Sequence, residues 1–458
     1  MNRHPDLPID GRPAPARAVQ DVGQLLDTGR FGTMQRFVVL LAALSIVMDG
    51  FDGQMIGFAI PAIIKEWGIA RSAFAPAVAA GLVGMGIGSA CGGLFADRFG
   101  RRWAVIGSVA LFGFATASIG LAHDVATIAL LRFIAGLGIG GALPSSTTMT
   151  AEFTPARLRT VAVTATIVCV PLGGMLAGLF ASQVLPAYGW RALFFVGGAL
   201  GVGLAAMLWL ALPESPRFLA RRPERWPELE RLLRRMGLAV SAGAGYEDAA
   251  ERTSGSRAGF GALFADGRAR DTVAIWCAFF MSLLAIYSAF SWLPTMLSAQ
   301  GLNVGMASGG LTAYNMGGVL GALGCSLAFN RYGSRLPLLL ACLGAAASAF
   351  ALLAVDAASN PALFIAGLGV HGMFANAVQS TMYALCAFVY PTQVRATGTA
   401  SALAFGRLGA ILSAFAGAMV ITAGGAAGYM SLLGGAMLLA LVALTAVRKH
   451  MPRPGRDA

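Results

Sequence analysis

Two aspartates stand inside a long apolar stretch near the start of the chain, 44-LSIVMDGFDGQMIGFAIPAI-63. Asp49 and Asp52 are three residues apart, so in a helix their side chains share one face. An ionised group at the centre of a membrane costs about 2.5–3.5 kcal/mol on insertion scales. The two carboxylates therefore predict a bundle interior or a wet cavity, where they are candidates to carry or gate a proton.

Two arginines in other apolar stretches could supply the opposite charge. Arg132 begins 132-RFIAGLGIGG-141, and Arg407 lies near the middle of its stretch, in 405-FGRLGAIL-412. A planar guanidinium matches a carboxylate with two parallel hydrogen bonds. We therefore expect Arg407, together with Arg132, to bind an organic anion. In the alternative interpretations, Arg132 forms a structural ion pair with a neighbouring helix, and an Asp–Arg407 pair only holds the outward-closed state.

A third group of polar residues lies in one apolar stretch, 361–389: His371, Asn376, Gln379 and Tyr383. Gln379 and Tyr383 are one helical turn apart, so they share a face that could line a cavity. We take the four as candidate substrate-binding residues. A single histidine in such a stretch is more often a hydrogen-bonded structural residue than a proton carrier, and this alternative stays open for His371.

The composition defines the elements that must position these residues. The chain has 458 residues, 57% of them hydrophobic and 12% charged, with a mean hydropathy of +0.71. These values exclude an ordinary soluble domain, and an all-α membrane protein with twelve spans is expected. The spans are 37–62, 74–96, 103–122, 125–151, 160–184, 191–212, 273–298, 308–329, 336–355, 361–389, 396–422 and 427–447.

The basic residues predict how the chain crosses the membrane. Of the 33 Lys and Arg residues, 28 lie in the two termini, the central segment and alternate turns, and three lie in the opposite set of turns. The positive-inside rule places the former set in the cytoplasm. We therefore expect a cytoplasmic tail (1–36), a six-helix bundle (37–212), a cytoplasmic loop (213–272), a second six-helix bundle (273–447) and a cytoplasmic tail (448–458).

This distribution also bears on partners. The net charge of +12 follows from the topology, so we expect the lipid bilayer as the partner and no nucleic acid. We expect no cleavable signal peptide, because residues 1–36 lack an apolar core segment. The six cysteines are far apart in apolar stretches and indicate no disulfide framework and no metal site.

The two halves repeat. The turn 97-DRFGRR-102 resembles 330-NRYGSR-335, and 155-PARLR-159 resembles 391-PTQVR-395, at offsets of 233 and 236 residues. Nearly equal offsets predict two parallel six-helix repeats with a substrate path between them. Small residues at four-residue spacing, Gly84, Gly88 and Gly92 in one span and Gly317 and Gly321 in another, predict closely packed helices.

The first of these turns is part of a longer motif, 93-GLFADRFGRR-102. Gly93 allows close helix contact, Asp97 can pair with Arg98, and Gly100 permits a tight turn. Arg101 and Arg102 hold the turn in the cytoplasm. In the alternative interpretation, the motif only fixes the topology of the chain in the membrane. Farther on, Glu152 ends its span, and we expect it to pair with an arginine of a turn.

This motif resembles the G-x-x-x-D-R-x-G-R-R signature of the major facilitator superfamily, and R-x-x-x-G-x-G-x-G at 132–140 is also common there. From about residue 21 to 447 the chain resembles the aromatic acid:H⁺ symporters of that superfamily. The most specific pieces are D-G-F-D at 49–52, 66-EWG-68, and 390-YPTQVRATG-398 with 406-GRLGA-410. The segment 413-SAFAG-417 departs from the Gly-Pro that such proteins often have there, which affects the shape of the pocket.

The resemblance implies a fold, site roles and a function. It implies the major facilitator fold, a requirement for Asp49 and Asp52 in transport, Arg132 and Arg407 as the intramembrane arginines, and residues 93–102 as the gate. We expect a multi-pass protein of the cell (inner) membrane, a monomer, that imports a small aromatic or other organic acid with protons. No cofactor is expected, because a proton gradient drives transport. The alternatives are a carrier of another metabolite such as a sugar or dicarboxylate, an exporter, and a membrane nutrient sensor; no constellation indicates an enzyme.

Overall fold

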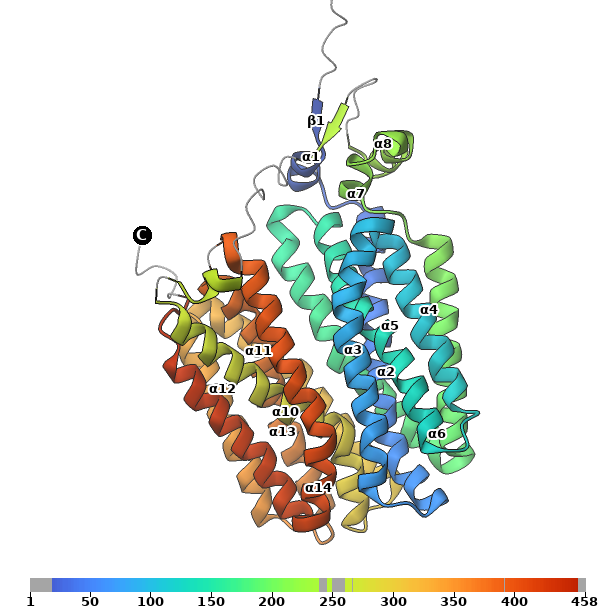
Figure 1. The fold of residues 1–458 in the computed structure, drawn as a ribbon, viewed down its shortest axis with the longest axis vertical. Coiled ribbons are helices and arrows are strands. Elements are labelled where there is room, and N and C mark those ends of the chain that lie inside the picture. The colour runs from blue at the N-terminus through green and yellow to red at the C-terminus, as the bar shows by residue number, and fades with distance from the viewer. Residues whose placement is uncertain (1–18, 239–244, 249–259, 266, 391, 452–458) are drawn as a thin grey trace, which may run out of the picture.

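The structure is a computed structural model that describes residues 19–238, 245–248, 260–265, 267–390 and 392–451. Within these residues, two groups of long helices stand side by side (Figure 1). The first group contains α2 (Thr33–Trp67), α3 (Arg71–Phe99), α4 (Arg101–Ile119), α5 (Val125–Phe153) and α6 (Ala156–Ala211). The second contains α10 (Ala269–Ala299), α11 (Val304–Tyr332), α12 (Arg335–Ala351), α13 (Pro361–Val389) and α14 (Thr392–Ala446).

Two of these helices each hold two of the predicted spans. Helix α6 has 56 residues and α14 has 55, and each is broken by one glycine with a positive φ. Gly189 (φ 75°) and Gly425 (φ 57°) adopt this backbone readily because glycine has no Cβ. The twelve predicted spans thus lie on ten helices, and nine described helices are long and apolar enough to cross a membrane, with α11 outside that group.

The breaks in the backbone follow the predicted repeat. Gly100 (φ 109°) separates α3 from α4, and Gly333 (φ 75°), 233 residues later, separates α11 from α12. Gly425 follows Gly189 by 236 residues. Residue 391, at the start of the second copy of the other motif, lies outside the described residues. Equivalent turns in the two halves therefore have equivalent backbone geometry.

The glycines predicted to bring helices together do so. A Cβ on Gly84 or Gly88 of α3 would overlap backbone carbonyl oxygens of α5. A Cβ on Gly317 or Gly321 of α11 would likewise overlap the backbone of α13. Larger residues would force these helix pairs apart, so the close packing in each half depends on small side chains.

The N-terminal and central segments lie at one end of the molecule, above the helices in Figure 1. Three helices there carry much of the polar chain: α1 (Val22–Thr28), α7 (Pro216–Ala220) and α8 (Trp226–Arg235). Strand β1 (Val19–Asp21) pairs in parallel with β2 (Gly245–Glu247). Short 3₁₀ helices lie at Pro223–Arg225, Phe260–Leu263 and Leu352–Ala354. We call this end the basic end and the other the opposite end.

Helix α8 is amphipathic. It buries Leu229, Leu232 and Leu233 against its neighbours and exposes its arginines. The apolar stripe at helical spacing accounts for this arrangement. The division of the chain into bundles, loop and tails at the predicted boundaries remains a prediction.

Candidate functional site

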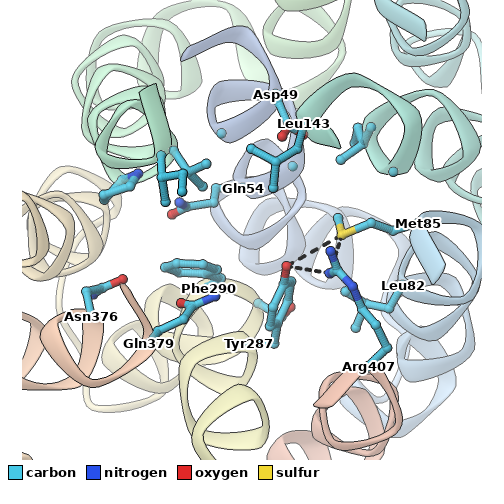
Figure 2. A pocket seen from close by; sticks show the side chains of 18 of the residues that line it. Asp49, Gln54, Leu82, Met85, Leu143, Tyr287, Phe290, Asn376, Gln379 and Arg407 are labelled. Atoms are coloured by element: carbon cyan, nitrogen blue, oxygen red, sulfur yellow. Dashed lines mark hydrogen bonds between the residues drawn. The ribbon is translucent and has the colours of Figure 1, made fainter. Parts of the chain in front are cut away.

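A cavity lies between the two halves of the molecule (Figure 2). Its volume is about 100 Å³, measured as the space open to the centre of a water molecule. One water needs roughly 10–15 Å³ on this measure, so the cavity has room for several waters or one small ring compound. Its polar lining comes from both halves: Asp49, Gln54, Arg132, Tyr287, Ser291, Asn376, Gln379, Ser380, Tyr383 and Arg407.

Arg407 of α14 points into this cavity beside Tyr287 of α10. Arg407 Nη1 donates a hydrogen bond to Tyr287 Oη at 2.7 Å and also contacts Met85 Sδ of α3. The guanidinium carbon lies 5.6 Å from the centre of the Tyr287 ring. Arg407 forms no salt bridge with a carboxylate of the described residues, so its other N–H groups are available to an anion.

Asp49 and Asp52 have different surroundings although both are buried. Asp49 lines the cavity and is 6% exposed, whereas Asp52 is 1% exposed and lies outside the lining. Neither carboxylate oxygen of Asp52 has a hydrogen-bond partner among the described residues. Asp52 Oδ2 lies 4.0 Å from Arg132 Nη1. The structure thus places Asp49 in the cavity and Asp52 in an ion pair behind it.

The sequence left open whether Arg132 of α5 binds substrate or forms a structural ion pair, and the structure gives it contacts of both kinds. It lines the cavity, yet its guanidinium faces Asp52 and reaches toward the carbonyl oxygens of Asp52 and Gly53 at 3.4 Å. The contact distances are long, and Arg132 Nε has no partner. The ion pair with α2 matches the structural interpretation of Arg132.

The polar face of α13 divides in two. Asn376, Gln379 and Tyr383 line the cavity. His371 does not: its Nδ1 lies 2.9 Å from Ala345 O and 3.2 Å from Ser348 Oγ, both on α12. The His371 ring is 5.8 Å from that of Tyr314. This geometry favours the structural alternative for His371 over substrate contact.

Two residues of the site were not among the candidates from the sequence. Tyr287 positions Arg407, and Gln54 crosses the interface between the halves. Gln54 Nε2 donates to Asn315 Oδ1 at 3.2 Å, and Asn315 Nδ2 donates to Gln54 Oε1 at 2.7 Å. The available signal was a polar side chain in the middle of an apolar stretch, which usually faces the bundle interior. The sequence does not show which partner such a residue meets.

The hydrogen bonds and the close approaches at glycines that are described between the halves lie at the cavity or toward the opposite end. The Gln54–Asn315 pair joins α2 to α11. Nearer the opposite end, a Cβ on Gly57 would overlap the backbone at Phe290, and one on Gly178 would overlap the side chain of Thr312. Helices from the two halves are therefore tightly packed on that side of the cavity.

At the basic end, the motif 93–102 contacts its own half and the central segment. Asp97 of α3 pairs with Arg101 of α4 at 2.7 Å, across the turn at Gly100, rather than with Arg98. Arg101 Nε lies 3.8 Å from Glu152 Oε1, which is the pair expected of Glu152. The close helix contact predicted at Gly93 is not formed here, since a Cβ there would meet open space.

The rest of the motif anchors the central segment. The backbone N–H of Arg102 donates to Glu214 Oε1 at 3.0 Å, and Arg102 Nη2 donates to Trp209 O at 2.6 Å. Arg222 donates to the carbonyl oxygen of Arg98, and Ser215 donates to Glu152. Gly100 makes the turn with φ 109°, as the sequence predicts.

Repeated helix bundles around a polar cavity define a secondary transporter of the membrane. The model of the Major Facilitator Superfamily matches residues 42–368 and 311–458, and this chain belongs to that superfamily. The 4-hydroxybenzoate transporter PcaK of Pseudomonas putida is 35% identical over 415 residues, covering 89% of this chain and 92% of that protein.

Other relatives carry related names. A gallate transporter of Pseudomonas putida is 31% identical, covering 90% of this chain and 91% of that protein. The 3-(3-hydroxy-phenyl)propionate transporter of Escherichia coli strain K12 is 32% identical, covering 91% of this chain and 96% of that protein. These relatives are transporters, so the chain is a multi-pass membrane transporter and not an enzyme.

A solved structure supports the fold. The partially occluded inward open conformation of the xylose transporter XylE from E. coli aligns with a TM-score of 0.71, covering 92% of this chain and 99% of that one. At 21% identity this likeness concerns the fold alone. It is consistent with the twelve-helix architecture.

Proposed function

We propose that the protein imports a small aromatic carboxylate together with protons by alternating access, with both termini in the cytoplasm. The observation that carries the proposal is the cavity itself. An arginine with available N–H groups, Arg407, and a buried carboxylate, Asp49, line the same small space between the two halves (Figure 2). Relatives named for hydroxylated aromatic acids support this class of substrate.

In this proposal Arg407 binds the substrate carboxylate. Its guanidinium is already oriented by the hydrogen bond to Tyr287 Oη and by the ring beneath it. An oriented guanidinium loses less freedom when it binds a carboxylate in a two-pronged geometry. The absence of a carboxylate partner in the described residues favours ligand binding over the alternative of an Asp–Arg407 lock.

Phe290, Leu82 and Leu143 form apolar walls of the cavity, beside which an aromatic ring would fit. Asn376 and Gln379 project from α13 on the side away from Arg407 (Figure 2). An amide can both donate to and accept from a hydroxyl group. We assign these two residues to a hydroxyl substituent on the ring, with Tyr383 as a further polar wall.

Asp49 is the residue that we assign to proton coupling. A substrate anion and an ionised Asp49 would place two negative charges in one cavity of low polarity, where their repulsion is strong. Binding a proton at Asp49 removes this repulsion, so proton and anion favour each other's binding. By linkage the effect is reciprocal, which is the thermodynamic requirement for symport. No cofactor takes part, since the proton gradient supplies the free energy.

Asp52 and Arg132 form the second charged layer of the proposal. Their 4.0 Å ion pair holds α2 against α5 behind Asp49. Arg132 also lines the cavity, so protonation of Asp52 would free its guanidinium toward the substrate. We therefore assign Asp52 a role in gating the proton and Arg132 a secondary role in substrate binding.

The gates follow from where the halves touch. The Gln54–Asn315 pair and the packing at Gly57 and Gly178 close the opposite end. The hydrogen bonds and ion pairs described for the motif at 93–102 all lie within its own half and the central segment. With the basic end in the cytoplasm, the structure represents an inward-facing state. Gly93, Asp97, Arg98, Gly100, Arg101 and Arg102 then form the gate that meets the second half when the cytoplasmic side closes.

Uptake into proteoliposomes tests this function. Labelled 4-hydroxybenzoate, benzoate, muconate and xylose are each offered with an imposed inward proton gradient, with and without a protonophore. We expect gradient-dependent accumulation of the aromatic acids that the protonophore abolishes. Accumulation of xylose alone would support a sugar carrier, and uptake driven by an outward gradient would support exchange or export. Binding of an acid to the purified protein without any flux would support a sensor.

A further inference from the structure

A second pocket lies outside the transport cavity, at the edge of the basic end. It has a volume of about 510 Å³ on the same measure. Its walls are the first turns of α2, the start of α4, the end of α6 with the residues that follow it, and α8. The lining consists of Met34, Phe37, Val38, Arg102, Leu210, Ala211, Leu212, Pro213, Glu214, Glu228, Arg231, Leu232 and Arg235.

Three arginines make the upper part of this pocket basic. Arg231 and Arg235 are exposed residues of α8, one turn apart, and neither forms a salt bridge with a carboxylate of the described residues. The only described hydrogen bond of Arg231 runs from Nε to Pro227 O, at 3.1 Å. Arg102 Nε is buried without a hydrogen-bond partner. Several N–H donors in one pocket therefore lack acceptors.

The two carboxylates in the lining do not cancel this charge. Glu228 is paired with Arg225, which is not part of the lining: Arg225 Nε and Nη2 donate to Glu228 Oε2 at 3.0 and 2.8 Å. Glu214 is 2% exposed and accepts from the backbone N–H groups of Arg102 and Ser215. Burial raises the pKa of Glu214 above its ordinary value.

The lower part of the pocket is apolar and continues onto the outer surface of the helices. Phe37 is 46% exposed and Leu210 is 81% exposed, and both line the pocket. Leu40 on α2 and Trp209 on α6 are also exposed beside them. In a membrane protein such exposed apolar side chains face the lipid chains, and tryptophan is common at the level of the headgroups. Basic groups above an apolar surface match the shape of one phospholipid.

We propose that this pocket binds the phosphate headgroup of an anionic phospholipid in the leaflet at the basic end, with the acyl chains along Phe37 and Leu210. Arg231, Arg235 and Arg102 would donate to the phosphate oxygens, since guanidinium groups bind phosphate with charge-assisted hydrogen bonds. The lipid would tie α8 to α2 and α6. A free phosphate would use the arginines but leave the apolar half of the pocket unused.

Native mass spectrometry of the purified full-length protein tests the proposal. The probes are phosphatidylglycerol and phosphatidylcholine with the same acyl chains, each titrated into detergent micelles. We expect phosphatidylglycerol to bind and to be retained much better than phosphatidylcholine. The double variant Arg231→Gln/Arg235→Gln should weaken phosphatidylglycerol binding about tenfold or more, because it removes two charge-assisted contacts.

The chain offers a matched control on the same helix. Arg234 is exposed, lies outside the pocket lining and faces Glu230 at 3.9 Å. Arg234→Gln removes the same charge and should leave binding within about twofold of the parent protein. All three sites are on the surface, so size-exclusion elution should not change. If the double variant elutes abnormally, phosphatidylglycerol binding is measured with the single variants Arg231→Gln and Arg235→Gln instead.

Three results would overturn the assignment. Equal binding of phosphatidylglycerol to the parent and to the double variant would show that these arginines do not hold the headgroup. Equal binding of phosphatidylcholine would show that the pocket is only an apolar groove. Displacement of phosphatidylglycerol by millimolar inorganic phosphate would show a site for a free anion instead of a lipid.

Discussion

Arg407 on α14 and Tyr287 on α10 form a hydrogen-bonded pair of 2.7 Å in the wall of the central cavity. The two residues are 120 positions apart in the chain, yet the phenol oxygen fixes one nitrogen of the guanidinium and the ring lies under its charge. The other N–H groups of Arg407 remain available to a substrate. The pair therefore orients the cation without neutralising it.

Removal of the Tyr287 hydroxyl should weaken substrate binding but leave the fold intact. Tyr287→Phe keeps the ring and deletes the acceptor that orients Arg407. A hydrogen bond to a charged group contributes roughly 1.5–3 kcal/mol, so the KM for an aromatic acid should rise about tenfold with little change in the maximal rate. Tyr188→Phe, at an exposed tyrosine, is the control. An unchanged KM in Tyr287→Phe would refute the positioning role.

Replacement of Asp49 should abolish accumulation driven by a proton gradient but preserve the exchange of substrate across the membrane. In Asp49→Asn the cavity holds a neutral amide at all pH values, so no proton is gained or lost with the substrate. We expect exchange of labelled for unlabelled acid to persist, while accumulation driven by a proton gradient falls to the level without a gradient. Parallel exchange and accumulation assays in the same proteoliposomes measure this. Normal accumulation would remove Asp49 from the coupling mechanism.

Asp52 should matter for stability as well as for transport, because its carboxylate faces Arg132 at 4.0 Å. Loss of one partner of a buried ion pair leaves the other charge unpaired, at a cost of roughly 3–5 kcal/mol. Asp52→Asn and Arg132→Gln should each lower the thermal unfolding temperature. The double variant should lower it by less than the sum, which a double-mutant cycle by thermal unfolding would show. Additive losses would mean that the two side chains do not interact.

The depth of the charged residues could be predicted from the sequence, but their partners could not. The count of apolar residues placed Asp49 and Arg407 near the middle of their spans, and both line one cavity. Met85 of the first half contacts Tyr287 and Arg407 of the second, 202 and 322 positions away. Asn315 pairs with Gln54 across the halves, and Tyr287 meets Arg407 within the second half, 120 positions away. Local patterns carry no information on such pairings.

Helical geometry explains why neighbouring candidates diverge. Residues three apart are rotated by roughly 60° around the helix, so Asp49 can face the cavity while Asp52 faces α5. His371 and Asn376 are five apart, a rotation of roughly 140°, which turns His371 toward α12. Gln379 and Tyr383 are one turn apart, and both line the cavity as predicted.

The Gln54–Asn315 amide pair should hold the opposite end closed. In Asn315→Leu the amide of Gln54 has no partner when the halves are in contact, which costs the closed state roughly 1–3 kcal/mol. The state in which this end is open does not have this cost. The population should shift by about tenfold toward the state in which this end is open. Thiol labelling of a single cysteine at Thr312, in a protein with its six cysteines replaced, should become correspondingly faster. A cysteine at Ser359, exposed in the structure, is the control, and unchanged labelling at 312 would contradict the gate.

Gln379 should determine the preference for ring substituents. It lines the cavity from α13, across the space from Arg407 (Figure 2), and Gln379→Leu replaces an amide by an apolar side chain of similar size. A site that hydrogen-bonds a hydroxyl group rejects the analogue that lacks it, because its own polar groups are then left unpaired. In the variant, the KM for benzoate divided by the KM for 4-hydroxybenzoate should therefore fall about tenfold, mainly because 4-hydroxybenzoate is transported less well. Competition between the two acids in uptake assays measures the ratio, with Gln183→Leu, at an exposed glutamine of α6, as the control. If the ratio is the same in both variants, the hydroxyl group is recognised elsewhere in the cavity, and Asn376 is the next residue to replace.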